Sequence, residues 1–155
     1  MSQILGEFDC KIDAKGRMRL PSTLLKKLVE GEGESFVINR GFEKCLVLYT
    51  KKEWEKITYR INKLNTYVKK NREFVRYFYR GATEVTPDSA DRVLLTKRLL
   101  EYAGIDKEVV LAPIKGTVEI WARERFDRNV EEEPENFEAL AEDVMGDLED
   151  ENEVA

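Results

Sequence analysis

Two short segments of the chain place an aspartate four positions before an arginine. Residues 13–17 read Asp-Ala-Lys-Gly-Arg, and residues 88–92 read Asp-Ser-Ala-Asp-Arg. An aspartate that starts a turn accepts backbone N–H bonds, and its carboxylate can also hold the later arginine. The planar guanidinium group of arginine suits phosphate oxygens and the edge of guanine. These segments therefore predict anion binding. The alternative is a plain exposed ion pair, which contributes little to stability.

The first segment carries most of the charge that a contact with nucleic acid requires. Arg17 can bind guanine through two parallel hydrogen bonds, while Lys15 is a flexible point charge better suited to phosphate. Arg19 follows Arg17 by two positions, so both fall on the same face of an extended strand. Asp13 and Gly16 hold the turn, Gly16 because its position requires a positive φ. We interpret Lys15, Arg17 and Arg19 as DNA-binding residues.

The second segment is poorer in positive charge. Asp91 stands where the first segment has glycine, Ala90 where it has lysine, and Leu94 where it has its last arginine. Arg92 remains a candidate DNA contact, and Asp88 is a turn residue. We expect the first segment to face DNA and the second to be chiefly structural.

Both segments belong to a longer pattern that occurs twice. The offset between matching positions drifts from 75 to 72 residues, as expected if only loops changed length. The matching pieces are apolar strands at 36–38 and 109–111, apolar strands at 46–49 and 118–121, and the aromatic residues Trp54 and Phe126. Each copy is predicted as strand, strand, helix, strand, strand, helix, and the copies as a pseudo-symmetric pair.

Local signals predict how the elements of the first copy begin and end. Alternation of polar and apolar residues over 7–13 and 17–20 predicts a hairpin with a basic tip. Ser22 or Thr23 is predicted to cap a short helix over residues 24–29.

Capping signals also predict two later helices. Thr50 and Glu53 form a capping box, which predicts a helix that starts after Thr50. Thr96 is predicted to cap a helix over 97–103, and Gly104 to end it.

The segment between the copies, residues 56–80, is rich in basic and aromatic residues and is predicted to form two helices. Its aromatic side chains could form a stacking platform for single-stranded nucleic acid. We favour the alternative, in which the aromatic residues pack in the core and the charges are solvated.

Charge is strongly divided along the chain. Residues 1–130 hold all 26 Lys and Arg residues and 19 acidic ones, a net charge of +7, whereas residues 131–155 hold 12 acidic residues and no basic one. This division suggests a polyanionic partner, although a solvated body with a solubilising tail gives the same numbers. Apolar residues in the tail recur at helical spacing and predict an acidic amphipathic helix. They are Phe137, Leu140, Ala141, Val144 and Leu148.

Composition excludes several classes of protein. The chain has 155 residues, 42% apolar and 37% charged, which indicates one compact domain or two small intertwined ones. It lacks an apolar run of about 18 residues and the features of a signal peptide, so we expect no membrane partner and a cytoplasmic location. Cys10 and Cys45 lie in apolar patterns, which favours reduced thiols. With no histidine, phosphate loop or metal-ligand spacing, we expect no enzyme, cofactor or metal.

A set of short motifs is specific in combination, although each is weak alone. They are Leu5-Gly6-Glu7, residues 13–17, Leu20-Pro21, Arg40-Gly41, residues 45–49, Glu53-Trp54, residues 80–84, Tyr102-Ala103-Gly104 and Glu119-Ile120-Trp121. Through these motifs the chain resembles the MraZ family of bacterial transcriptional regulators, which is related to the AbrB-like regulators. The resemblance covers about residues 3–127.

The resemblance implies an α+β fold, a swapped-hairpin (AbrB-like) β-barrel formed by two tandem pseudo-symmetric repeats with flanking and bridging helices. The expected divisions are repeat one at 3–57, a basic helical bridge at 58–82 and repeat two at 83–128. The acidic tail at 129–155, a candidate helix from its apolar spacing, lies outside the resemblance.

The resemblance also implies a function. Members of the family form homo-oligomeric rings and regulate transcription by binding double-stranded DNA at direct repeats in the promoter of their own division and cell-wall gene cluster. The Asp-x-x-x-Arg hairpin is their DNA-contacting signature, and a cytoplasmic, nucleoid-associated location follows. The alternatives are a non-enzymatic protein-interaction scaffold and a DNA-binding antidote subunit of a toxin pair.

Overall fold

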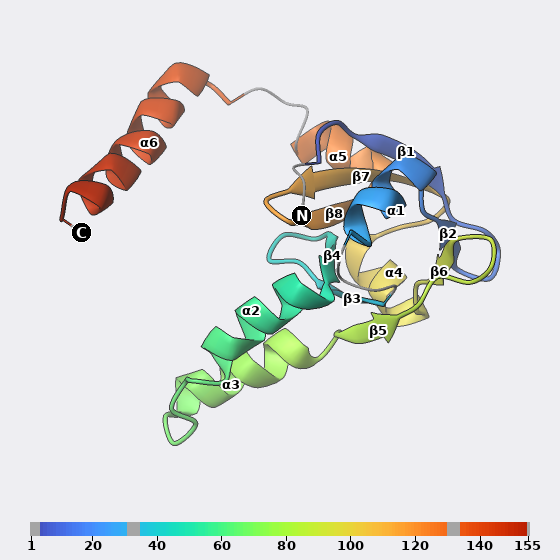
Figure 1. The fold of residues 1–155 in the computed structure, drawn as a ribbon, viewed down its shortest axis with the longest axis horizontal. Coiled ribbons are helices and arrows are strands. Elements are labelled where there is room, and N and C mark those ends of the chain that lie inside the picture. The colour runs from blue at the N-terminus through green and yellow to red at the C-terminus, as the bar shows by residue number, and fades with distance from the viewer. Residues whose placement is uncertain (1–3, 31–34, 130–133, 155) are drawn as a thin grey trace. The chain divides into compact units, whose positions relative to one another are not determined.

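The computed structural model describes residues 4–30, 35–129 and 134–154 and shows a mixed α+β chain (Figure 1). Its elements are β1 (Phe8–Lys11), β2 (Arg17–Arg19), α1 (Ser22–Leu28), β3 (Phe36–Arg40), β4 (Leu46–Thr50), α2 (Lys51–Ile61), α3 (Lys69–Tyr79), β5 (Thr83–Val85), β6 (Arg92–Leu94), α4 (Lys97–Ala103), β7 (Glu108–Ile114), β8 (Thr117–Ala122), α5 (Arg123–Asn129) and α6 (Phe137–Val154). One compact unit, Met1–Arg123, contains every strand, and a second unit is Glu124–Ala155.

The strands form one large antiparallel sheet and one small ribbon. The sheet has six strands in the order β1-β7-β8-β4-β3-β5, and β2 pairs with β6 in the two-stranded ribbon. Four of these pairings join the first copy of the pattern to the second: β1 with β7, β4 with β8, β3 with β5, and β2 with β6. The two halves of the sequence are therefore interleaved through their backbone hydrogen bonds.

The predicted first hairpin forms only at its turn. Asp13 N–H donates to Arg17 C=O at 3.0 Å, and the ladder between these two segments is limited to a single bridge, Ile12 to Met18. The predicted hairpin with a basic tip is therefore present as a turn closed by one bridge, and its arms pair with β7 and β6 instead of with each other. Beyond the bridge the segments diverge, and their backbone groups find partners in the second copy, because buried N–H and C=O groups must be paired.

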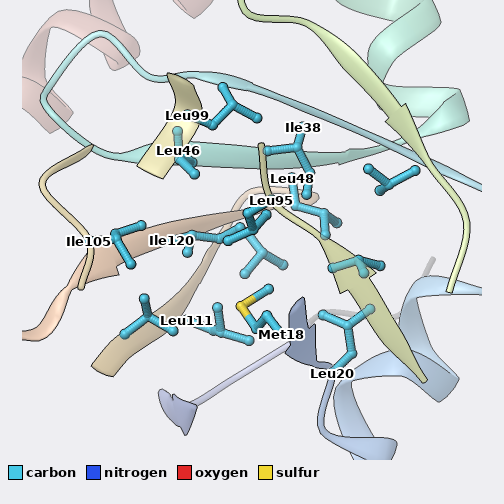
Figure 2. Close-up of a cluster of buried hydrophobic side chains, with 14 of the residues drawn as sticks. Met18, Leu20, Ile38, Leu46, Leu48, Leu95, Leu99, Ile105, Leu111 and Ile120 are labelled. Atoms are coloured by element: carbon cyan, nitrogen blue, oxygen red, sulfur yellow. The ribbon is translucent and has the colours of Figure 1, made fainter. Parts of the chain in front are cut away.

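The core lies between the sheet and the ribbon (Figure 2). Met18 and Leu20 from the first copy belong to the same buried cluster as Leu95 and Leu99 from the second. The predicted inward direction of Met18 and Leu20 is confirmed. Because the ribbon buries one face in this core, its alternating residues must present the other face outward.

The capping predictions had mixed outcomes. Thr50 Oγ1 accepts from the Glu53 N–H at 3.2 Å, and Thr96 caps α4 in the same way, as predicted. The predicted cap of α1 by Ser22 or Thr23 was wrong. Pro21 occupies the N-cap position of α1, and its C=O accepts from the Leu25 N–H at 2.9 Å, so helical bonding starts one residue earlier than the Ser22 cap requires.

The basic bridge forms two helices, α2 and α3, that run away from the sheet (Figure 1). Trp54 and Phe78 stack with their ring centroids 5.7 Å apart, so part of the predicted aromatic packing is confirmed. Other aromatic side chains are exposed, and the core interpretation is wrong for them. They are Tyr59, Tyr67, Phe74 and Tyr77.

The remaining predictions concern thiols, membranes and the tail. Cys45 is buried, Cys10 is half-buried, both are free, and burial raises their pKa values to about 12 and about 11. In the described part of the chain, every helix is too short or too polar to cross a membrane. The predicted tail helix is present as α6, and its side chains Phe137 and Val144 are exposed. The side chain of Leu148 lies outside the described residues.

Candidate nucleic-acid interface

The two Asp-x-x-x-Arg turns have nearly the same hydrogen bonds. Asp13 Oδ1 accepts from the backbone N–H groups of Lys15 and Arg17, both at 2.9 Å. Asp88 Oδ1 accepts in the same way from Ala90 and Arg92, again at 2.9 Å. Each aspartate therefore organises its turn with one carboxylate oxygen and keeps the other for its arginine.

The second carboxylate oxygen forms an ion pair in each turn. Arg17 Nε lies 2.7 Å from Asp13 Oδ2, and Arg92 Nε lies 2.9 Å from Asp88 Oδ2. These contacts leave the terminal Nη groups of both arginines without a hydrogen bond to any described residue. Each aspartate thus orients its guanidinium group through Nε, and the Nη groups on the outer edge remain available to an acceptor.

The same contacts change the acidity of the two aspartates. The pKa of Asp13 is held below its ordinary value, chiefly by the backbone N–H of Arg17 and further by the arginine side chain, against a smaller effect of desolvation. The pKa of Asp88 is lowered by the corresponding contacts with Arg92 and Ala90. Both carboxylates are therefore ionised at neutral pH, which keeps the arginines positioned.

Each turn also hydrogen-bonds to the strand that follows the other turn. Gly16 C=O accepts from Leu95 N–H at 2.8 Å, and Asp91 C=O accepts from Leu20 N–H at 2.9 Å. Gly16 has φ 84°, as predicted, and Asp91 has φ 61° at the matching position. The substitution of Asp91 for glycine therefore leaves the turn geometry largely unchanged.

The register of β2 and β6 decides which side chains share the exposed face. Met18 lies opposite Val93 on the buried side. On the outer side Arg17 lies opposite Leu94, and Arg19 lies opposite Arg92. We call the four outer residues, Arg17, Arg19, Leu94 and Arg92, the ribbon face.

The ribbon face is positively charged. Arg19 is exposed and forms no ion pair with any residue that the structure describes, and it stands directly across from Arg92. Like charges opposite each other on a strand pair are destabilising, so this arrangement favours an external anion. Lys15 is exposed in the adjoining turn, with no side-chain bond among the described residues.

The structure thus brings together all the arginines predicted to bind DNA. Sequence reasoning placed Arg92 apart from Arg17 and Arg19, because the partner of a strand cannot be read from its local pattern. It also missed Leu94 as an exposed apolar residue within the charged face, although the alternation of residues 92–94 indicates that Leu94 points the same way as Arg92. Among the described residues, no group of three or more His, Cys, Asp or Glu could hold a metal ion.

One protein family matches the chain in two successive segments, in agreement with the twofold pattern of the sequence. A family model described as "MraZ protein, putative antitoxin-like" matches residues 4–77 and again residues 78–148. The chain is 42% identical to "Transcriptional regulator MraZ" of Christiangramia forsetii over 147 residues, which cover 94% of this chain and 95% of that protein. It is 38% identical to proteins of the same name from Flavobacterium psychrophilum, with 97% and 96% covered, and from Desulforamulus reducens, with 91% and 96% covered.

These matches span nearly the whole length of this chain and of each relative, and they include the two turns and the helical bridge. The relatives are named as transcriptional regulators and not as enzymes. The chain therefore belongs to the MraZ family of transcriptional regulators and is not an enzyme.

Proposed function

We propose that this protein binds double-stranded DNA through the ribbon face and regulates transcription from the promoter to which it binds. The observation that carries the proposal is the β2–β6 register, which puts Arg17, Arg19 and Arg92 on one exposed surface. A two-stranded antiparallel ribbon can enter the major groove, which is about 12 Å wide.

Each arginine has a role that follows from its contacts. Arg17 and Arg92 are held through Nε, so their outer Nη groups can point at base edges, and guanine O6 and N7 are the acceptors that match them. Arg19 and Lys15 have no such anchor among the described residues and suit phosphate oxygens. The sequence favoured the first turn alone, but Arg92 shares a face with Arg17 and Arg19, and we therefore propose that both turns contact DNA. Asp13, Gly16 and Asp88 position the arginines without touching it.

The distribution of charge supports a polyanionic ligand. The acidic residues that make the whole chain negative are concentrated in residues 131–155, whereas residues 1–130 have a net charge of +7. Attraction of a basic surface to DNA is steep in salt, because bound cations are released from the phosphates.

The finer expectations from the sequence complete the proposal. We propose that the interleaved strands represent a swapped-hairpin arrangement of two repeats, bounded as expected at 3–57 and 83–128, and that the protein assembles into a homo-oligomeric ring. One ribbon face offers few contacts, so several faces matched to direct repeats would gain affinity through effective concentration. The proposed target is the promoter of the protein's own division and cell-wall gene cluster, which gives it a nucleoid-associated location in the cytoplasm.

A binding titration tests these assignments. Fluorescence anisotropy would be measured with duplexes from the upstream region of the gene that carry one, two or three repeats, at several salt concentrations. We expect affinity to rise with repeat number and to fall steeply with salt. Equal, salt-insensitive affinity for all three duplexes would contradict multivalent binding to phosphates.

A matched pair of variants tests the site itself. We expect Arg17→Ala to weaken binding by about 1–3 kcal/mol per engaged base contact. Arg60→Ala, which removes an exposed arginine from α2, should bind like wild type. If the two variants bind equally while remaining folded and assembled, the ribbon face is not the DNA contact.

A further inference from the structure

A second basic surface lies outside the ribbon face. A groove of about 700 Å³ is lined by the end of β3, the junction of α3 and β5, and the first turns of α4. Its charged side chains are Arg40, Arg80, Arg98 and Glu101, so the lining contains three guanidinium groups and one carboxylate. None of the ribbon-face residues lines this groove.

Arg40, which lines the groove, is held by contacts with two tyrosines. Its Nη2 donates to the Tyr77 C=O at 2.6 Å, and its Cζ lies 4.1 Å from the centre of the Tyr77 ring and 5.2 Å from that of Tyr102. Gly81 permits this position, because a Cβ there would lie 2.8 Å from Arg40 Cγ. The guanidinium group is therefore held in place before any ligand arrives.

Within the described ranges, no carboxylate forms an ion pair with Arg40, and its buried Nε has no hydrogen-bond partner. A buried N–H normally has an acceptor, and a partly buried cation normally has a counter-charge, because desolvation is costly without them. An anion in the groove would supply that counter-charge.

Arg80 and Arg98 also line the groove. Both are exposed, and neither forms a hydrogen bond or ion pair through its side chain with a residue that the structure describes. Arg80 lies at the C-terminal end of α3 and Arg98 in α4, so the two guanidinium groups can approach a ligand from different elements. Several guanidinium groups around one site suit a phosphate, which has more acceptor oxygens than a carboxylate.

We propose that this groove is a binding site for a phosphate group, separate from the ribbon face. Its volume is typical of sites for small ligands, which measure about 300–1,000 Å³, so it has room for a phosphate with an organic substituent. Two sources share this chemistry: the backbone of DNA bound at the ribbon face, and a free phosphorylated compound.

Titration with inorganic pyrophosphate tests the site on the full-length protein. Binding would be followed by calorimetry at an ionic strength held constant with sodium chloride. We expect Arg80→Ala and Arg98→Ala each to weaken pyrophosphate binding by about tenfold, the loss of one charge-assisted hydrogen bond. Lys107→Ala, which removes an exposed cation elsewhere in the same compact unit, should bind like wild type. Both arginines are exposed, so their loss should leave unfolding in buffer unchanged.

A DNA titration with the same variants distinguishes the two sources. If pyrophosphate and DNA affinities both fall, the groove takes a phosphate of the DNA backbone. If only pyrophosphate affinity falls, the ligand is a free phosphorylated compound. The proposal is overturned if pyrophosphate affinity is the same in wild type, Arg80→Ala and Arg98→Ala, whatever happens to DNA. Because the pyrophosphate measurement contains no DNA, its result does not depend on the ribbon face being correct.

Discussion

Replacing Gly16 by alanine tests the reasoning about the turn most directly. Gly16 has φ 84°, and a Cβ built there would lie 2.8 Å from the backbone oxygen of Leu95. The left-handed conformation costs a non-glycine residue about 1–2 kcal/mol. Relief of the clash must move the backbone that bonds Gly16 C=O to Leu95 N–H, and loss of that hydrogen bond costs about 0.5–1.5 kcal/mol.

The expected total is a loss of about 1.5–3.5 kcal/mol of unfolding free energy. For a chain of this size, this corresponds to a decrease in Tm of roughly 3–14 °C. In the second turn, Asp91 occupies the position that matches Gly16 and has φ 61°. We therefore expect the backbone of the Gly16→Ala variant to shift toward a smaller positive φ. Urea unfolding followed by tryptophan fluorescence measures the loss, and protein concentration must be held fixed in case the protein assembles.

Gly6→Ala is the matched control. Gly6 has φ 91°, and a Cβ there would meet no atom within 4 Å, so this change adds backbone strain without the clash. We expect its cost to be clearly smaller than that of Gly16→Ala. If the two variants lose the same stability, close packing of Gly16 against the other copy is not what requires glycine.

Three further changes probe the ribbon and its turns. Leu94→Arg adds a guanidinium group opposite Arg17, so we expect the slope of log affinity for DNA against log salt concentration to steepen by about one. An unchanged slope would mean that this face does not contact phosphates. Asp91→Gly removes left-handed strain but makes the unfolded chain more flexible, so urea unfolding should show a gain of at most about 1 kcal/mol, and a loss would show that the Asp91 side chain stabilises the turn. Asp13→Asn keeps the backbone acceptor but removes the charge. Because the folded pKa of Asp13 is lowered, its contribution to stability is present above the ordinary carboxyl pKa and is lost as pH falls through the folded value, so the difference between wild type and Asp13→Asn should be largest at neutral pH and disappear in acid. A pH-independent difference in urea unfolding would exclude the ion pair as its cause.

Much of the local structure could be predicted from the sequence, because its causes are local. The turn at Asp13 and Gly16 follows from a carboxylate beside free backbone N–H groups and from a residue that adopts positive φ readily. The cap at Thr50 has an equally local cause. Alternation placed Met18 inside and Arg17 outside, since the side-chain period of a strand is two whatever its partner is. The twofold pattern and the division of charge are likewise properties of the sequence alone.

The tertiary structure decided which strands pair, and with them the composition of the candidate site. A strand pattern specifies which face is apolar but not which of several similar strands lies beside it. Residues 17–19 found their partner in residues 92–94, and this pairing put Arg92 across from Arg19 and Leu94 across from Arg17. The basic groove also depends on tertiary structure. Arg40, Arg80 and Arg98 are distant in sequence and come together only where β3, α4 and the segment before β5 pack. Their proximity depends on long-range packing, which no local spacing of residues encodes.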